Sequence, residues 1–269
     1  MTGQLRTLPP PAPAVSPPPE SLAGKVPAAE WETRVELAAC YRIFDLLGWT
    51  EMIFNHITAR VPGEDGHLLI NPFGLTYSEV TASNLVKIDL NGAVVGDSRW
   101  PVNEAGVVIH GAIHGSRPDA HCVMHTHTTA GTAVACLRSG LNGDNFYSAQ
   151  LHQRVAYHEF EGITVNPGEK PRLIANLGDR DLMILRNHGL IAVGPSIPTA
   201  FAALWTLQRA CEIQIAAQSG GHRLRRVTAR AARQSTAESF QAGDRTHAGL
   251  DLFLAMRRAV DRAGHDYLS

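Results

Sequence analysis

Cysteine, long apolar runs and net charge are all scarce in this chain of 269 residues. No window approaches eighteen uninterrupted apolar residues, and the first thirty lack the apolar core of a secretory signal. The sequence therefore predicts a cytoplasmic protein that neither crosses a membrane nor is exported. No C-x-x-C pair occurs, so we expect reduced, mostly buried thiols rather than a disulfide framework at the four cysteines, Cys40, Cys122, Cys136 and Cys211.

An excess of charge of one sign is also missing. The chain has 24 lysines and arginines against 25 aspartates and glutamates. This balance gives no electrostatic attraction for a polyanion, so we expect no nucleic-acid partner and no anionic membrane surface. The motifs G-x-G-x-x-G, the Walker loop and G-x-S-x-G do not occur. Small molecules or other proteins remain as partners.

Proline is concentrated at one end of the chain. Half of the 16 prolines lie within the first 27 residues. Such a segment can form neither helix nor sheet, so we predict that residues 1–28 are a disordered arm outside the fold. A polyproline ligand for a partner domain is the alternative.

The pattern changes from residue 29 onward. Apolar residues at helical spacing predict a first helix that ends near Gly48, helices over about 105–115, 129–138 and 197–218, and more helix to the end. We expect strands over 56–61, 67–70, 121–125 and 182–185, and a hairpin turn over 90–93. This alternation predicts one α/β domain over residues 29–220, with helices covering a mixed sheet and residues 221–269 as a helical extension.

Histidine is unusually frequent, and two apolar runs end in it. His125 and His127 close the first run, and their spacing of two puts both side chains on one face of a strand. His188 closes the second run and would complete a three-histidine metal site if the two strands were neighbours. By itself a His-x-His pair favours surface or core histidines over a metal site, and only the two runs together make the two interpretations equal. His110 and His114 could also chelate a metal, but we interpret His110 as a structural residue bonded in the core.

Several separated motifs resemble the class II aldolase/adducin family in order and spacing, over about residues 30–220. The adducin-like bacterial branch is the most similar. The motifs are Phe54-Asn-His-Ile57, Ile70-Asn-Pro-Phe-Gly-Leu75, Asn103-Glu-Ala-Gly-Val-Val-Ile-His110, Arg117-Pro-Asp119, His125-Thr-His127, Val155-Ala-Tyr-His158, Arg186-Asn-His-Gly-Leu190 and Ala210-Cys-Glu-Ile-Gln214.

The resemblance implies an α/β/α sandwich around a mostly antiparallel sheet, in a homo-oligomer that is usually a fourfold tetramer with active sites at subunit interfaces. It also implies one divalent metal per chain, zinc first and manganese or iron as alternatives, held by His125, His127 and His188. The family loops that cradle the polar end of the substrate correspond to Asn55, Asn71 and Gly74. Turn chemistry also explains these three residues.

One expected residue is missing from the family pattern. The sugar-phosphate aldolases carry a glutamate base, and the alignment places it at Gly106. Glu104, two residues earlier, is the candidate replacement, but it falls where those enzymes bind the substrate phosphate with a serine. A carboxylate there would repel a phosphate by roughly 1 to 4 kcal/mol, which disfavours a phosphorylated sugar.

The resemblance and the missing base together favour a metal-dependent carbon-carbon lyase. We expect a decarboxylase or aldolase that acts on a small unphosphorylated keto, hydroxy or phenolic acid through a metal-stabilised enolate. Retro-aldol cleavage needs a base, whereas decarboxylation needs only an electron sink, so decarboxylation is favoured. Tyr147 is the candidate acid, donated across a subunit interface, with simple packing as the alternative. A non-haem iron oxygenase and a non-catalytic adducin-like assembly module are the other functions considered.

Overall fold

Seven strands pair into one sheet at the centre of the computed structural model, which describes residues 20–163, 167–239, 247–264 and 266–269. The strand order is β3-β2-β1-β4-β7-β6-β5. All neighbours run antiparallel except β5 and β6, which are parallel. The strands are β1 (His56–Arg60), β2 (His67–Ile70), β3 (Val86–Asp89), β4 (Cys122–Thr126), β5 (Val155–His158), β6 (Leu182–Leu185) and β7 (Gly189–Gly194).

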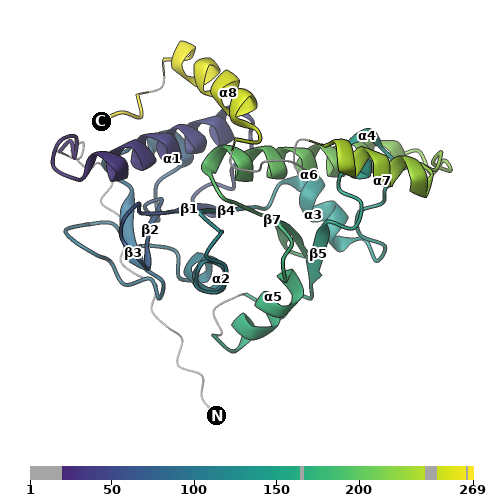
Figure 1. Cartoon of the computed structure of the whole chain (residues 1–269), viewed down its shortest axis with the longest axis horizontal. Coiled ribbons are helices and arrows are strands. Elements are labelled where there is room, and N and C mark those ends of the chain that lie inside the picture. The colour runs from purple at the N-terminus through teal and green to yellow at the C-terminus, as the bar shows by residue number, and fades with distance from the viewer. Residues whose placement is uncertain (1–19, 164–166, 240–246, 265) are drawn as a thin grey trace.

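Helices cover both faces of this sheet (Figure 1). On one face lie α1 (Ala28–Leu46), α3 (Thr129–Cys136), α6 (Ile197–Gln218) and α8 (Leu250–Arg262), whose buried side chains share a core with alternate residues of β1 and β4. On the other face, α2 (Glu104–Ser116) and α5 (Lys170–Leu177) pack against the intervening residues of β4, β6 and β7. This arrangement is the predicted α/β/α sandwich, with a mixed, mostly antiparallel sheet.

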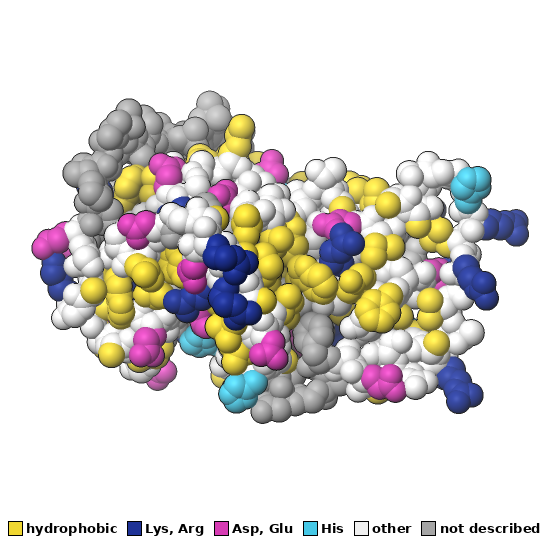
Figure 2. Space-filling view, turned by 90° about the horizontal axis from the view of Figure 1, so that it is seen from above, with side chains coloured by type: hydrophobic (Ala, Val, Ile, Leu, Met, Phe, Trp, Pro, Cys, Tyr) yellow, Lys and Arg dark blue, Asp and Glu magenta, His cyan; other side chains and the backbone are white. Residues whose placement is uncertain are grey.

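Two shorter helices lie at one end of the molecule. They are α4 (Phe146–Gln150) and α7 (Ala229–Glu238), which pack together next to α6 (Figure 1). Figure 2 shows the face that carries α1, α6 and α8, where hydrophobic side chains gather across the middle and basic side chains project at the α7 end. The short 3-10 turns η1 (Tyr77–Glu79) and η2 (Pro167–Glu169) complete the elements.

The predicted elements are found close to their expected places. The helix expected over 197–218 and the strand expected over 182–185 have the predicted bounds, and the chain turns between Asp89 and Ala93 as expected. Three strands, β3, β5 and β7, were not predicted. Of the predicted N-terminal arm, residues 1–19 lie outside the described residues, whereas the backbone N–H of Leu22 donates to Ser83 Oγ at 3.0 Å.

Helix length and composition also bear on membranes. Among the described residues, no helix is both long enough and apolar enough to cross a membrane.

Candidate metal centre

Three histidine rings meet at one end of the sheet. His125 lies near the end of β4, His127 follows that strand directly, and His188 lies in the tight turn between β6 and β7. We predicted that His188 would reach the pair if β4 and β6 were neighbours. That condition is wrong, because β7 lies between them and pairs with both. The rings meet because His188 directly precedes β7, and β7 pairs with β4, the strand that carries His125.

Local structure fixes this turn. Asn187 has a left-handed backbone, with φ of 55°, and its N–H donates to the carbonyl of Ala135 in α3. The Thr132 hydroxyl of α3 donates to the His188 carbonyl at 3.1 Å. At Gly189 an added Cβ would lie 2.3 Å from the Thr126 carbonyl oxygen, so only glycine allows β7 to start this close to β4.

The ring nitrogens are close enough to share one cation. His125 Nε2 lies 2.8 Å from His127 Nε2 and 3.3 Å from His188 Nε2. One ligand atom from each ring lies within 4.8 Å of the others. Zinc–nitrogen bonds of about 2.0 to 2.1 Å at tetrahedral angles separate two nitrogens by about 3.3 Å, so small shifts convert this cluster into a chelate.

The protonation states also suit a metal. The Leu190 carbonyl lies 2.9 Å from His125 Nδ1, so Nδ1–H donates there and Nε2 carries the lone pair. Burial lowers the pKa of His125 far below its ordinary value, and burial next to His127 lowers the pKa of His188 to about 4. Burial also lowers the pKa of His127. Neutral imidazoles are the form that binds metals, and this donor set fits Zn²⁺, Mn²⁺ or Fe²⁺.

A cavity of about 370 Å³ opens beside the three rings. Its walls are largely apolar, with Phe54, Ile109, Phe160 and Ile163 among the lining residues. Ile163 is 80% exposed and Phe160 53% exposed, so the mouth carries apolar surface. No lysine, arginine, aspartate or glutamate is among the described residues that line the cavity.

Of the three residues expected to bind substrate, the structure brings only Asn55 to the cavity. Asn55 is buried, has a φ of 63°, and neither side-chain atom finds a hydrogen-bond partner. Such unpaired buried atoms cost about 1 to 3 kcal/mol each, which a bound ligand would offset. Asn71 instead accepts from the Tyr41 hydroxyl within the core, at 2.9 Å, and Gly74 lies in the turn after β2. Neither is among the lining residues.

The two residues expected to act in catalysis are not at this cavity. Glu104 is the first residue of α2, where its side chain is exposed, although its neighbours Asn103 and Ala105 line the cavity. Tyr147 lies on α4 and packs edge-on against Trp205 of α6, with ring centroids 5.4 Å apart. The role predicted for Tyr147 requires a neighbouring subunit and stays a prediction.

Sequence reasoning assigned no role to His56, a polar residue that lines this cavity. At Gly106, where the family pattern expects glutamate, an added Cβ would lie 2.8 Å from the His56 ring. The imidazole thus fills the space into which a side chain at position 106 would extend. His56 also contacts His110, with ring centroids 4.3 Å apart. His110 is bonded in the core to Thr58, as predicted. The signal available in the sequence was a histidine at the start of a predicted strand, within the Phe54-Asn-His-Ile57 motif.

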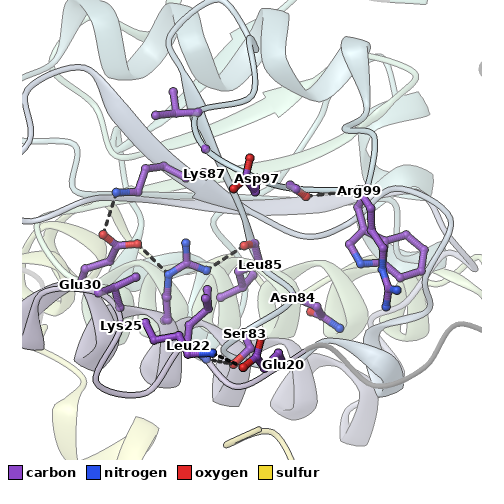
Figure 3. Close-up of a pocket in the computed structure, with 16 residues that line it drawn as sticks. Glu20, Leu22, Lys25, Glu30, Ser83, Asn84, Leu85, Lys87, Asp97 and Arg99 are labelled. Atoms are coloured by element: carbon purple, nitrogen blue, oxygen red, sulfur yellow. Dashed lines mark hydrogen bonds and ion pairs between the residues drawn. The ribbon is translucent and has the colours of Figure 1, made fainter.

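A larger hollow lies elsewhere and has a different character. It measures about 600 Å³ and lies between the segment after residue 20, α1 and β3 (Figure 3). Its central charges pair with one another: Lys87 Nζ lies 2.7 Å from Glu30, and Arg34 Nε lies 2.8 Å from the same carboxylate. Because these partners satisfy each other, we place the candidate site at the histidine cavity.

Comparisons with known proteins agree with this fold. Residues 35–215 match the model of the class II aldolase and adducin N-terminal domain. The solved structure of an aldolase II superfamily protein from Pseudomonas syringae superposes with a TM-score of 0.87 at 44% identity, covering 93% of this chain and 100% of that one.

Two further relatives carry specific names. L-fuculose 1-phosphate aldolase from Glaciozyma antarctica superposes with a TM-score of 0.78 at 27% identity, covering 89% of this chain and 93% of that one. Alpha-adducin of Rattus norvegicus is 49% identical over 193 residues, which are 70% of this chain but 26% of that protein. On its sequence, its three-layer fold and these matches, the chain belongs to the class II aldolase and adducin family.

Proposed function

We propose that this protein is a metal-dependent carbon-carbon lyase, a decarboxylase or aldolase, that acts on a small unphosphorylated keto, hydroxy or phenolic acid. The observation that carries the proposal is the convergence of three neutral imidazoles beside a cavity. Three protein ligands leave coordination positions open, as in catalytic rather than structural sites. His125, His127 and His188 would hold one divalent metal per chain, zinc first and manganese or iron as alternatives.

The lining of the cavity supports the substrate class. A phosphate group is ordinarily bound by arginine, lysine or several backbone N–H groups, and no described lining residue is an arginine or a lysine. The apolar walls formed by Phe54, Ile109 and Phe160 suit a hydrocarbon or aromatic tail. Asn55 offers an amide donor and an acceptor, both unpaired, for the polar end of the ligand.

The chemistry follows from these groups. When bound, a divalent metal would polarise the oxygens of a chelated acid and stabilise the negative charge that develops as a carbon-carbon bond breaks. The apolar walls would exclude water from the reacting carbon, and the Leu190 carbonyl keeps the His125 lone pair directed at the cluster. No carboxylate is among the described residues that line the cavity. This favours decarboxylation over retro-aldol cleavage, because loss of carbon dioxide requires no proton to be abstracted.

The likeness to alpha-adducin favours a second candidate, a non-catalytic assembly module. Against it stands the three-histidine cluster, because a scaffold has no physical need for three converging lone pairs. No observation favours the oxygenase alternative, since the carboxylate that would join two histidines around iron is absent from the described lining.

We also propose that the protein works as a cytoplasmic homo-oligomer, a tetramer with interface sites. Exposed apolar side chains that line the cavity, Phe160 at 53% and Ile163 at 80%, support a covering chain or ligand there. In such an assembly, Tyr147 of a neighbouring subunit would be the proton donor. Glu104, exposed near the cavity, stays the second candidate for catalysis.

The test is a screen of keto, hydroxy and phenolic acids for carbon dioxide release and for aldol cleavage, with protein loaded with Zn²⁺, Mn²⁺ or Fe²⁺. We expect turnover with at least one acid, and loss of that turnover in His125→Ala and His188→Ala with assembly retained. Full activity in either variant would refute the site. Iron-dependent oxygen consumption would instead favour the oxygenase.

A further inference from the structure

His56 lies against the metal centre without belonging to it. It is the first residue of β1 and pairs directly with His125 across the antiparallel strands, so the two side chains lie on the same face of the sheet. The two ring centroids are 5.2 Å apart. Among the described residues, the set of converging ligand atoms includes His125, His127 and His188 but not His56. His56 does line the cavity beside them.

Both ring nitrogens of His56 are buried and unpaired. The residue is 3% exposed, and neither Nδ1 nor Nε2 has a hydrogen-bond partner among the described residues. Two unpaired nitrogens on one buried ring are unusual, because buried polar side-chain atoms are almost always hydrogen-bonded. The neighbouring Asn55 has the same property at both of its amide atoms. Four unpaired polar atoms therefore come from consecutive residues at one wall of the cavity.

The neighbouring His110 ring does not donate a hydrogen bond to His56. His114 Nδ1 lies 2.9 Å from the Ala120 carbonyl, so Nδ1–H donates and the neutral ring has its lone pair on Nε2. That lone pair accepts a hydrogen bond from the Thr58 hydroxyl, whose oxygen lies 2.8 Å away. The same Thr58 oxygen lies 2.7 Å from His110 Nδ1, so it accepts a hydrogen bond from the Nδ1–H of His110. His110 Nε2 is therefore a lone pair. The ring next to His56 has no N–H left to donate to it.

Packing holds the His56 ring in place. His110 contacts one side of it, and the absence of a side chain at Gly106 makes room for it, since a Cβ there would lie 2.8 Å from three ring atoms. A buried ring that is fixed by packing and has an unpaired N–H and lone pair loses little conformational entropy when it binds a ligand.

We propose that His56 binds the ligand directly, by hydrogen-bonding an oxygen of a small 2-oxo or 2-hydroxy acid whose other oxygens lie at the three-histidine cluster. The inference rests on the proposed function and adds to it a residue that selects for this class of acid. Hydroxyl and carboxylate oxygens suit the available groups: the neutral ring donates to a carboxylate or accepts from a hydroxyl, and Asn55 does the same beside it. Apart from Asn103 and the three histidines of the cluster, the rest of the described lining is apolar.

The experiment measures binding rather than turnover. Protein loaded with Co²⁺ is titrated with mandelate and, separately, with oxalate, and the visible absorption of the cobalt reports the dissociation constant. The variants are His56→Phe, which keeps a ring but removes both nitrogens, and His56→Gln, which keeps hydrogen-bonding capacity. The control is His222→Asn, an exposed histidine distant from β1 in the sequence. Circular dichroism and cobalt content are measured for each protein.

We expect all four proteins to hold about one Co²⁺ per chain. His56→Phe should weaken mandelate binding about tenfold or more, whereas His56→Gln should recover part of the loss and His222→Asn should match the unmodified protein. The proposal is overturned if folded His56→Phe binds both acids within about twofold of the unmodified protein, if it loses the metal, or if the metal-loaded unmodified protein binds neither acid. An unmodified protein that takes up no metal would overturn the proposed function itself, a result that the cobalt content reports separately.

Discussion

Single residues decide whether the three rings can meet, and Gly189 shows this most directly. An alanine Cβ there would lie 2.3 Å from the Thr126 carbonyl oxygen and 3.0 Å from a carbon of the His127 ring. We predict that Gly189→Ala displaces the start of β7, destabilises the protein by more than about 2 kcal/mol and lowers metal content. Urea unfolding and elemental analysis measure the two effects. Gly143→Ala, whose Cβ would meet nothing within 4 Å, is the matched control. Normal metal content and stability in Gly189→Ala would contradict the account.

The sequence was informative about the metal ligands and much less so about their surroundings. His125, His127 and His188 could be predicted because each follows an apolar run, which implies a strand end. Asn71 was expected at the cavity, yet it is tied to Tyr41, a contact between segments thirty residues apart that no local pattern reveals. His56 was missed because its role comes from the register that sets it opposite His125, and register is a property of the assembled sheet.

At the level of elements, helix α2 carries a buried histidine whose charge state depends on folding. Burial, with the Arg60 guanidinium adding to it, lowers the pKa of His114 to about 3, whereas the unfolded ring titrates near 6.5. Below pH 6.5 the unfolded chain therefore binds a proton that the folded chain does not. The stability that this ring contributes is complete above pH 6.5 and falls as the pH drops towards 3, by about 1.4 kcal/mol per pH unit.

This pH dependence can be measured by urea unfolding between pH 7.5 and 4.5 in the presence of a chelator. We predict that the free energy of unfolding falls with acid, and that His114→Gln reduces the slope by about 1.4 kcal/mol per pH unit below pH 6. Equal slopes for the two proteins would show that His114 is protonated in the folded state.

Elements with a strong local pattern were predicted well, and those without one were not. Helix α6 has Ser196 as N-cap, which accepts from the Thr199 N–H, and Pro198 in its first turn, so its bounds can be predicted from the sequence alone. Strand β7 begins and ends in glycine and is buried along its whole length. Its pairing with β4 and β6 stabilises it, and a short apolar run with two glycines gives no sign of those partners.

On the scale of the whole molecule, the last described residues connect helix α8 to the segment that follows η1. Tyr267 is 2% exposed, its carbonyl accepts from the Ala82 N–H at 2.9 Å, and its hydroxyl donates to Asp261 at 2.7 Å. We predict that Tyr267→Ala lowers the free energy of unfolding by about 3 kcal/mol, and Tyr267→Phe by about 1 kcal/mol. Thermal unfolding measures both. Metal content should be unchanged, because these contacts lie on α8 and the η1 region rather than at the cavity; a loss of metal would show that the two regions are coupled.

The account depends most directly on whether the three histidines hold a metal. The decisive measurement is elemental analysis of protein purified without chelators, compared with His125→Ala, His188→Ala and the control His222→Asn, together with the change in thermal stability on adding Zn²⁺, Mn²⁺ or Fe²⁺. We predict about one divalent metal per chain in the unmodified and control proteins, little in the two site variants, and a rise in melting temperature on metal addition. Equal metal in all four proteins would contradict the account, and less than about 0.1 metal per chain with no stabilisation by any of the three ions would contradict it and favour the non-catalytic scaffold.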